Sequence, residues 1–230
     1  MMLTDDVPVY GPTKRVAAIA TVVFPILLTL GFLMHPRLLY PSMTLTAADL
    51  AAKFHHRPSF HVGHLIVFAA VPAIILSLAH FMGSVRGRGR RFALAGGLTG
   101  IIGAVILAGD KGALCLVLSA FDSLPETDFQ AIFPALQAIV DRAGLLKVFW
   151  LLPLLPVGAM LQLIALIMEK RIRRALGIVG IAGLALLNNP DIDIVSSIGG
   201  ILLCCAYVPL GLGMLRRRRR PTSVAAGSVA

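Results

Sequence analysis

Long apolar runs alternate with short polar segments along the chain, and this pattern predicts helices that cross a membrane. A helix needs about 20 residues to span the roughly 30 Å of hydrocarbon in a bilayer. Helices are favoured because backbone polar groups in lipid must be satisfied within their own segment, and the alternating pattern of a β-barrel is absent. The sequence therefore predicts an all-α polytopic membrane protein, a compact six-transmembrane-helix bundle with spans at about 16–34, 62–83, 92–110, 148–168, 175–189 and 194–215.

Two of these spans are irregular. The third apolar run continues past Ala108 through Asp110 and Lys111 to Phe121, which is longer than a bilayer requires. The fifth falls short of a full crossing before Asn188 and Asn189, so it would thin the bilayer, draw these amides inward or be re-entrant. Short or interrupted spans are a weak indication of a binding site.

Composition and charge support the membrane class. Apolar residues make up 57% of the chain and charged residues only 14%, against about 25% charged in an average soluble domain. The net charge of +10 comes from basic clusters at the ends of apolar runs, which favours binding to membrane lipids over nucleic acid. These clusters predict a multi-pass protein of the cytoplasmic membrane with both termini in the cytoplasm, a single domain over residues 1–215 and a basic, disordered tail over 216–230.

The loops opposite the basic clusters predict two short amphipathic helices on the outer face. Thr46 and Asp49 open one of them. Ser123 followed by Glu126 is a capping-box pattern, and Pro134 is expected to bend the helix that follows. These helices could be lids over a site or interfacial helices that fill space. The apolar positions at helical spacing are Leu50 and Phe54 in the first segment, and Phe129, Ile132, Phe133, Leu136, Ile139 and Val140 in the second.

Glycines are spaced so that they share a helix face in two of the predicted spans. Such faces let helix backbones approach closely, which matters where lipid solvates apolar side chains as well as protein does. They could pack within the bundle, or against a membrane-protein partner or a second copy of the chain. The positions are Gly96, Gly97, Gly100 and Gly103 in the third span, and Gly177, Gly180 and Gly183 in the fifth.

The candidate chemistry lies with polar groups near the outer boundary of the membrane. Five of the six histidines fall at the end of the first span or the start of the second. Ionisable groups near lipid are costly unless they pair or line a wet cavity, so this layer is the predicted functional site. The candidates for ligand binding or proton coupling are His35, His61, His64, Asp110, Lys111, Lys147, Asn188 and Asn189.

Metal binding is a further possibility, and the identity of any cofactor stays open. His61 and His64 are three residues apart, so both imidazoles could approach one ion from a shared helix face. The three cysteines, Cys115, Cys204 and Cys205, have no zinc or disulfide spacing. The chain has no Walker phosphate loop, no H-E-x-x-H and no G-x-S-x-G.

These features favour a protein that binds or handles a small ligand, lipid or ion at a polar pocket on the extracytoplasmic side, as a transport or accessory component. The alternatives are a membrane-embedded enzyme acting on an apolar substrate with outer-face histidine and aspartate, and a metal-binding membrane protein. Purely structural roles for the interfacial histidines remain open as well.

Overall fold

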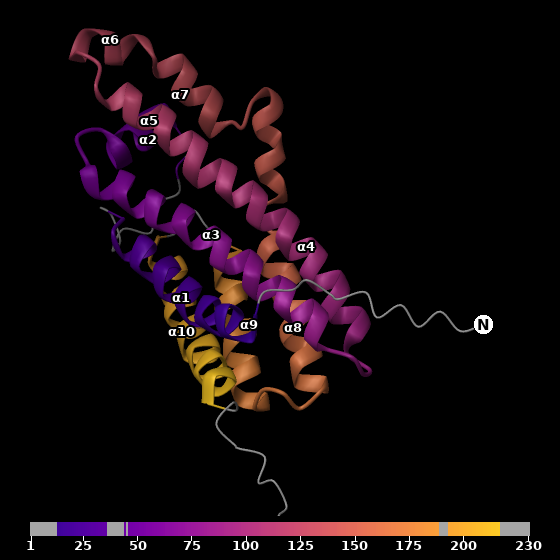
Figure 1. Cartoon of the computed structure of the whole chain (residues 1–230). Coiled ribbons are helices and arrows are strands. Elements are labelled where there is room, and N and C mark those ends of the chain that lie inside the picture. The colour runs from indigo at the N-terminus through magenta and orange to yellow at the C-terminus, as the bar shows by residue number, and fades with distance from the viewer. Residues whose placement is uncertain (1–12, 36–43, 45, 189–192, 217–230) are drawn as a thin grey trace, which may run out of the picture.

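The computed structural model describes residues 13–35, 44, 46–188 and 193–216, and every regular element in this part of the chain is helical (Figure 1). The all-α prediction is therefore confirmed for the described residues. The elements are α1 (Lys14–Leu33), α2 (Ala47–Phe54), α3 (Pro58–Ser84), α4 (Arg90–Ala108), the π-helical turn η1 (Gly109–Ala113), α5 (Leu114–Asp122), α6 (Glu126–Ala131), α7 (Phe133–Val140), the 3-10 helix η2 (Gly144–Leu151), α8 (Leu154–Met168), α9 (Arg174–Leu187) and α10 (Asp193–Arg216).

Five helical segments among the described residues are long and apolar enough to cross a membrane, as expected of a multi-pass membrane protein. The fifth predicted span corresponds to α9, whose 14 residues rise only about 21 Å. The five long segments are Lys14–Leu33, Pro58–Ser84, Arg90–Asp122, Phe133–Met168 (which includes α7, η2 and α8) and Ile194–Arg216.

The segment that starts at Arg90 extends beyond the predicted span, over the full length of its apolar run. Its third-span prediction ended at residue 110, whereas the helix continues through η1 and α5 to Asp122. The helix survives the polar interruption because η1 inserts a single wider turn, after which apolar residues resume at Leu114. The whole segment is about 50 Å long, so its α5 end extends beyond the thickness of a bilayer core.

The start of α8 also differs from the predicted span. α8 begins at Leu154 rather than at residue 148, and the residues before it form η2. Pro153 is the N-cap of α8 and cannot donate a backbone hydrogen bond, which accounts for a helix boundary at this point. Trp150 of η2 is 66% exposed, and the Arg142 guanidinium lies 4.5 Å from the centre of its ring.

Glycine pairs set the contacts between the long helices. A Cβ at Gly31 of α1 would lie 2.8 Å from the carbonyl oxygen of Gly63 in α3, and one at Gly183 of α9 would lie 2.8 Å from that of Gly199 in α10. A Cβ at Gly158 of α8 would overlap the backbone of α4. Close backbone packing of this kind is a common way for helices to associate in lipid. The predicted glycine faces of α4 and α9 are buried inside this chain.

Polar side chains link the same helices in the interior. Gln162 of α8 is buried, and its amide donates to the carbonyl oxygens of Leu78 in α3 at 2.9 Å and Ala93 in α4 at 3.1 Å. The Thr21 and Ser77 hydroxyls of α1 and α3 lie 3.0 Å apart. Hydrogen bonds between helices contribute about 0.6 kcal/mol each on average in membrane proteins. These contacts define the helix bundle of α1, α3, α4, α8, α9 and α10.

A second core joins α2, α6 and α7 to the ends of α3 and α5. We call this unit the cap, and its fully buried centre is Phe54, Phe129 and Leu136. Thr46 and Asp49 open α2 as predicted, and they form a capping box. The capping box predicted for Ser123 and Glu126 is absent, because Pro125 is the N-cap of α6 and the Ser123 hydroxyl donates to the carbonyl oxygen of Ala120 instead. The predicted second amphipathic segment is two helices, with Pro134 in the first turn of α7. Figure 1 shows the cap at one end of the molecule, opposite the α8–α9 connection.

Candidate functional site

The Asp110 and Lys111 side chains lie in η1, the π-helical turn that interrupts the long helix. The Lys111 Nζ lies 2.9 Å from Asp110 Oδ2, and the two side chains are 21% and 14% exposed. A charge near lipid is costly by itself, and this pairing offsets part of that cost. Single π-helical turns inside α-helices frequently occur at functional sites.

A cavity of about 120 Å³ lies between the helices of the bundle, and Asp110 and Lys111 form part of its wall. About 10–15 Å³ on this measure holds one water molecule, so the cavity has room for a ligand larger than a few waters. It is lined by residues of α1, α3, α4, η1, α8, α9 and α10, together with His35 after α1 and Asn188 after α9.

The walls of this cavity are mostly apolar, and its polar groups are few. Phe24, Leu28, Ile74, Leu107, Leu155 and Leu203 are among the apolar lining residues. Four of the predicted site residues line it together: His35, Asp110, Lys111 and Asn188. Helices α1 and α9 both begin next to basic residues, at Lys14 and Arg174. His35 and Asn188 follow the opposite ends of these helices.

His64 lies next to this polar group without lining the cavity. Its side chain is buried, and its ring is stacked on that of His35 with centroids 5.0 Å apart. The Nδ1 atom lies 2.9 Å from the carbonyl oxygen of Phe60. Because a carbonyl can only accept, Nδ1 carries the proton and donates it. The structure therefore places His64 as a support for the His35 ring.

His61 has different partners from His64. Its Nε2 lies 3.3 Å from Asp122 Oδ2, and its Nδ1 lies 3.8 Å from the Cys115 sulfur. His61 and His64, the predicted metal-binding pair, therefore contact different side chains among the described residues. Lys147 is exposed on η2 and does not line the cavity, and Asn189 is outside the described residues.

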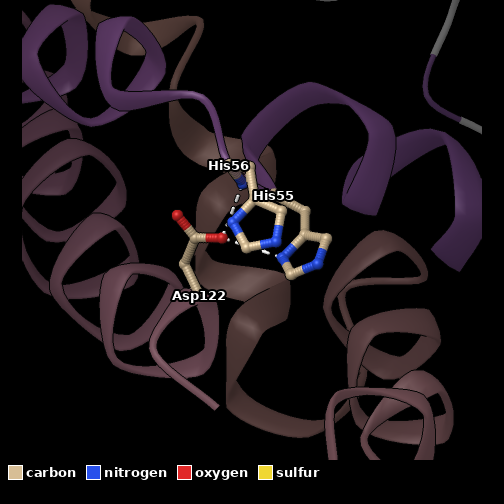
Figure 2. A group of neighbouring side chains, drawn as sticks. All are labelled: His55, His56 and Asp122. Atoms are coloured by element: carbon tan, nitrogen blue, oxygen red, sulfur yellow. Dashed lines mark hydrogen bonds and ion pairs between the residues drawn. The ribbon is translucent and has the colours of Figure 1, made fainter. Parts of the chain in front are cut away.

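A second polar cluster lies where the α2–α3 turn meets the end of α5, and sequence reasoning missed it. The Asp122 carboxylate is 16% exposed. Its Oδ1 lies 2.8 Å from His55 Nδ1 and also accepts from the His56 backbone N–H at 2.8 Å. Figure 2 shows the two imidazoles and this carboxylate facing one another. In the sequence, the adjacent histidines His55 and His56 are the one feature that could have indicated this cluster. Nothing in the sequence indicates that Asp122 lies beside them.

The backbone at His56 has a conformation that favours glycine. Its φ is 52°, and a non-glycine residue in a sparsely populated region of this kind costs roughly 1–3 kcal/mol. The turn places the ring of His56 over that of His55, with centroids 3.9 Å apart. On its other side, His55 is stacked on Phe129 of α6 at 3.8 Å. Packing in the cap therefore holds the His55 ring in place.

Glu126 extends the cluster from the first turn of α6. Its Oε2 lies 3.4 Å from His55 Nε2, and its other oxygen accepts from the Gln130 amide at 2.9 Å. The Gln130 hydrogen bond, followed by that of His55, holds the pKa of the exposed Glu126 carboxyl below its ordinary value. Glu126 is therefore ionised at neutral pH, and the His55 ring lies between two carboxylates.

Comparison with protein families, curated proteins and solved structures gives no match for this chain. Function is therefore inferred from the geometry of the cavity and of the histidine cluster.

Proposed function

We propose that this protein binds a small amphiphilic ligand, such as a single-chain lipid, in the cavity of the helix bundle. The observation that carries this proposal is the composition of the cavity wall. Apolar side chains from six helices surround a space that also receives His35, Asp110, Lys111 and Asn188. Ligand sites in proteins commonly combine apolar walls with a few convergent polar groups of this kind.

The charges at the cavity wall favour a neutral or zwitterionic head group. Lys111 is paired with Asp110 at 2.9 Å, so the pair adds no net charge. The Asn188 amide and the His35 ring supply further hydrogen-bonding groups beside it. The apolar remainder of the wall matches an acyl chain. A monoacylglycerol has both features.

The proposed topology places the polar part of this cavity on the extracytoplasmic side. The basic clusters at the α3–α4 and α8–α9 connections and at the end of α10 lie in the cytoplasm under this proposal, following the preference of basic loops for that side. α9 then provides a sixth crossing in a locally thinned cytoplasmic membrane. The cap lies over the outer ends of α3 and α5. Any partner protein or second copy of the chain contacts the exposed apolar surface of the bundle, because the glycine faces of α4 and α9 are buried.

Cysteine labelling tests this topology in cells. In a variant without the native cysteines, Ser123→Cys lies between α5 and α6, and Arg88→Cys lies in the α3–α4 connection; both positions are exposed. A membrane-impermeant maleimide added from outside should label Ser123→Cys, and should label Arg88→Cys only after the membrane is permeabilised. The reverse pattern would overturn the proposed orientation.

Photo-crosslinking tests the ligand. Diazirine-labelled monoacylglycerol should label peptides from the cavity wall of the protein in nanodiscs. Leu187→Trp should strongly reduce this labelling because it fills part of the cavity near Asn188. Ile178→Trp is the matched control on the same helix, since Ile178 is 54% exposed and faces away from the cavity. Labelling confined to lipid-facing residues, and equal in both variants, would contradict the proposal.

A further inference from the structure

The histidine cluster of the cap shares no residue with the lining of the bundle cavity, and it has the composition of a metal site. His55 and His56 form the turn between α2 and α3, and Asp122 ends α5. We infer that His55, His56 and Asp122 bind one transition-metal dication of the Zn²⁺ class, with a water molecule completing the coordination. This site is separate from the proposed lipid site and does not depend on it.

The distances between the donor atoms fit this inference. One ring nitrogen from each histidine and one Asp122 oxygen all lie within 4.8 Å of one another. Zn²⁺ binds nitrogen and oxygen ligands at about 2.0–2.1 Å, so two ligands on a tetrahedral ion are about 3.3 Å apart. His55 Nδ1 and Asp122 Oδ1, now 2.8 Å apart, need to separate by only a fraction of an ångström. The His56 ring, which is exposed and lies over the His55 ring, needs only a small rotation to direct a nitrogen at the same ion.

The hydrogen-bond partners around the cluster are of the kind that surround metal-bound histidines. Glu126 Oε2 lies 3.4 Å from His55 Nε2, so Nε2–H can donate to this carboxylate when Nδ1 binds a metal ion. Histidine ligands of metals usually donate their second N–H to a carboxylate, which is the role Glu126 has here.

Hydrogen bonds also hold the Asp122 carboxylate in place. Its Oδ1 accepts from the His56 backbone N–H at 2.8 Å, and its Oδ2 lies 3.3 Å from His61 Nε2, which can donate to it. These contacts fix the carboxylate without using all of its acceptor capacity. The mixture of imidazole nitrogens and carboxylate oxygen favours Zn²⁺ or a neighbouring transition metal over Mg²⁺ or Ca²⁺, which prefer oxygen ligands alone.

Metal titration of tag-free protein in detergent tests the inference. After treatment with EDTA and removal of the chelator, Zn²⁺ should bind at one ion per chain, measured by calorimetry and by elemental analysis after dialysis. Co²⁺ should give the visible absorption of a tetrahedral site. His56→Asn and Asp122→Asn should each weaken Zn²⁺ binding at least about tenfold. His80→Asn, at the other end of α3, and Asp128→Asn, in α6, are matched controls that should bind as the unaltered protein does.

The His56→Asn variant keeps the test independent of folding. Asparagine tolerates the positive φ of this position, and the backbone N–H to Asp122 is retained. Zn²⁺ should raise the Tm of the unaltered protein and of Leu187→Trp but not that of His56→Asn. Binding below one ion per chain, or equal binding by His56→Asn, would overturn the metal site.

Discussion

The helix bundle and the cap are stabilised by different means. In the bundle, glycines bring helix backbones close together and large side chains such as Leu163 and Leu203 fill the interior, while Leu98, Ile102 and Val105 are more than half exposed on the outside. In the cap, the interior is made by large side chains, with Phe54 and Leu136 fully buried. The cap therefore buries its large residues, whereas the bundle exposes many of them.

This difference reflects the solvent to which each region is suited. In lipid, an apolar side chain gains little by moving inward, so close backbone packing and hydrogen bonds between helices dominate association. In water, burial of large apolar side chains is the main driving force. The contrast supports the proposal that the cap lies outside the hydrocarbon, where the polar groups around Asp122 are in contact with water or ions.

The largest expected effect is on the cap. Phe129→Ala removes a ring that is 2% exposed and contacts Phe54, Phe133 and His55. It should destabilise the cap by about 3–5 kcal/mol. Hydrogen exchange should then rise in α2, α6 and α7 while the bundle stays protected. Phe92→Ala, at a 41% exposed position of α4, is the control, and equal effects of the two variants would contradict the division into two regions.

A smaller effect is expected from an added methyl group in the bundle. A Cβ at Gly158 would overlap the α4 backbone at Gly96 and Gly100. Gly158→Ala should therefore destabilise the protein by about 1–3 kcal/mol in equilibrium unfolding from mixed micelles. Gly213→Ala has open space around the new methyl group and should have little effect. If both variants were neutral, close α4–α8 packing would not be what stabilises the bundle.

The smallest effect concerns the hydrogen bond between α1 and α3. Thr21→Val keeps the shape of the side chain and removes the 3.0 Å contact with Ser77. We expect a loss of about 0.6 kcal/mol. A double-mutant cycle with Ser77→Ala isolates the pair, and a coupling energy of zero would show that this bond does not contribute.

The hydrophobic pattern was sufficient to predict an all-helical chain with several long apolar helices, because span length depends on the thickness of the bilayer rather than on tertiary contacts. It did not give the bounds of the third and fourth spans. The sequence also placed His35, Asp110 and Lys111 together near the outer boundary of the membrane, and the three residues line one cavity. The π-helical turn was not predicted, since composition does not distinguish it from the surrounding α-helix.

The histidine cluster could not be predicted in the same way. Its members come from the α2–α3 turn and from the end of α5, and they meet only because the long helix continues beyond the predicted third span. The predicted pairing of His61 with His64 used helical spacing alone. The direction of each ring depends on partners distant in the chain, Asp122 for one and His35 for the other.

The central claim is that the polar and apolar parts of the cavity bind one amphiphile together. The direct measurement compares crosslinking by diazirine-labelled monoacylglycerol with that by a diazirine-labelled alkane lacking a head group. The unaltered protein should prefer the monoacylglycerol at the cavity wall, and Asp110→Asn with Lys111→Gln, which removes both charges together, should lose that preference. Equal labelling of the unaltered protein by both probes would contradict the claim.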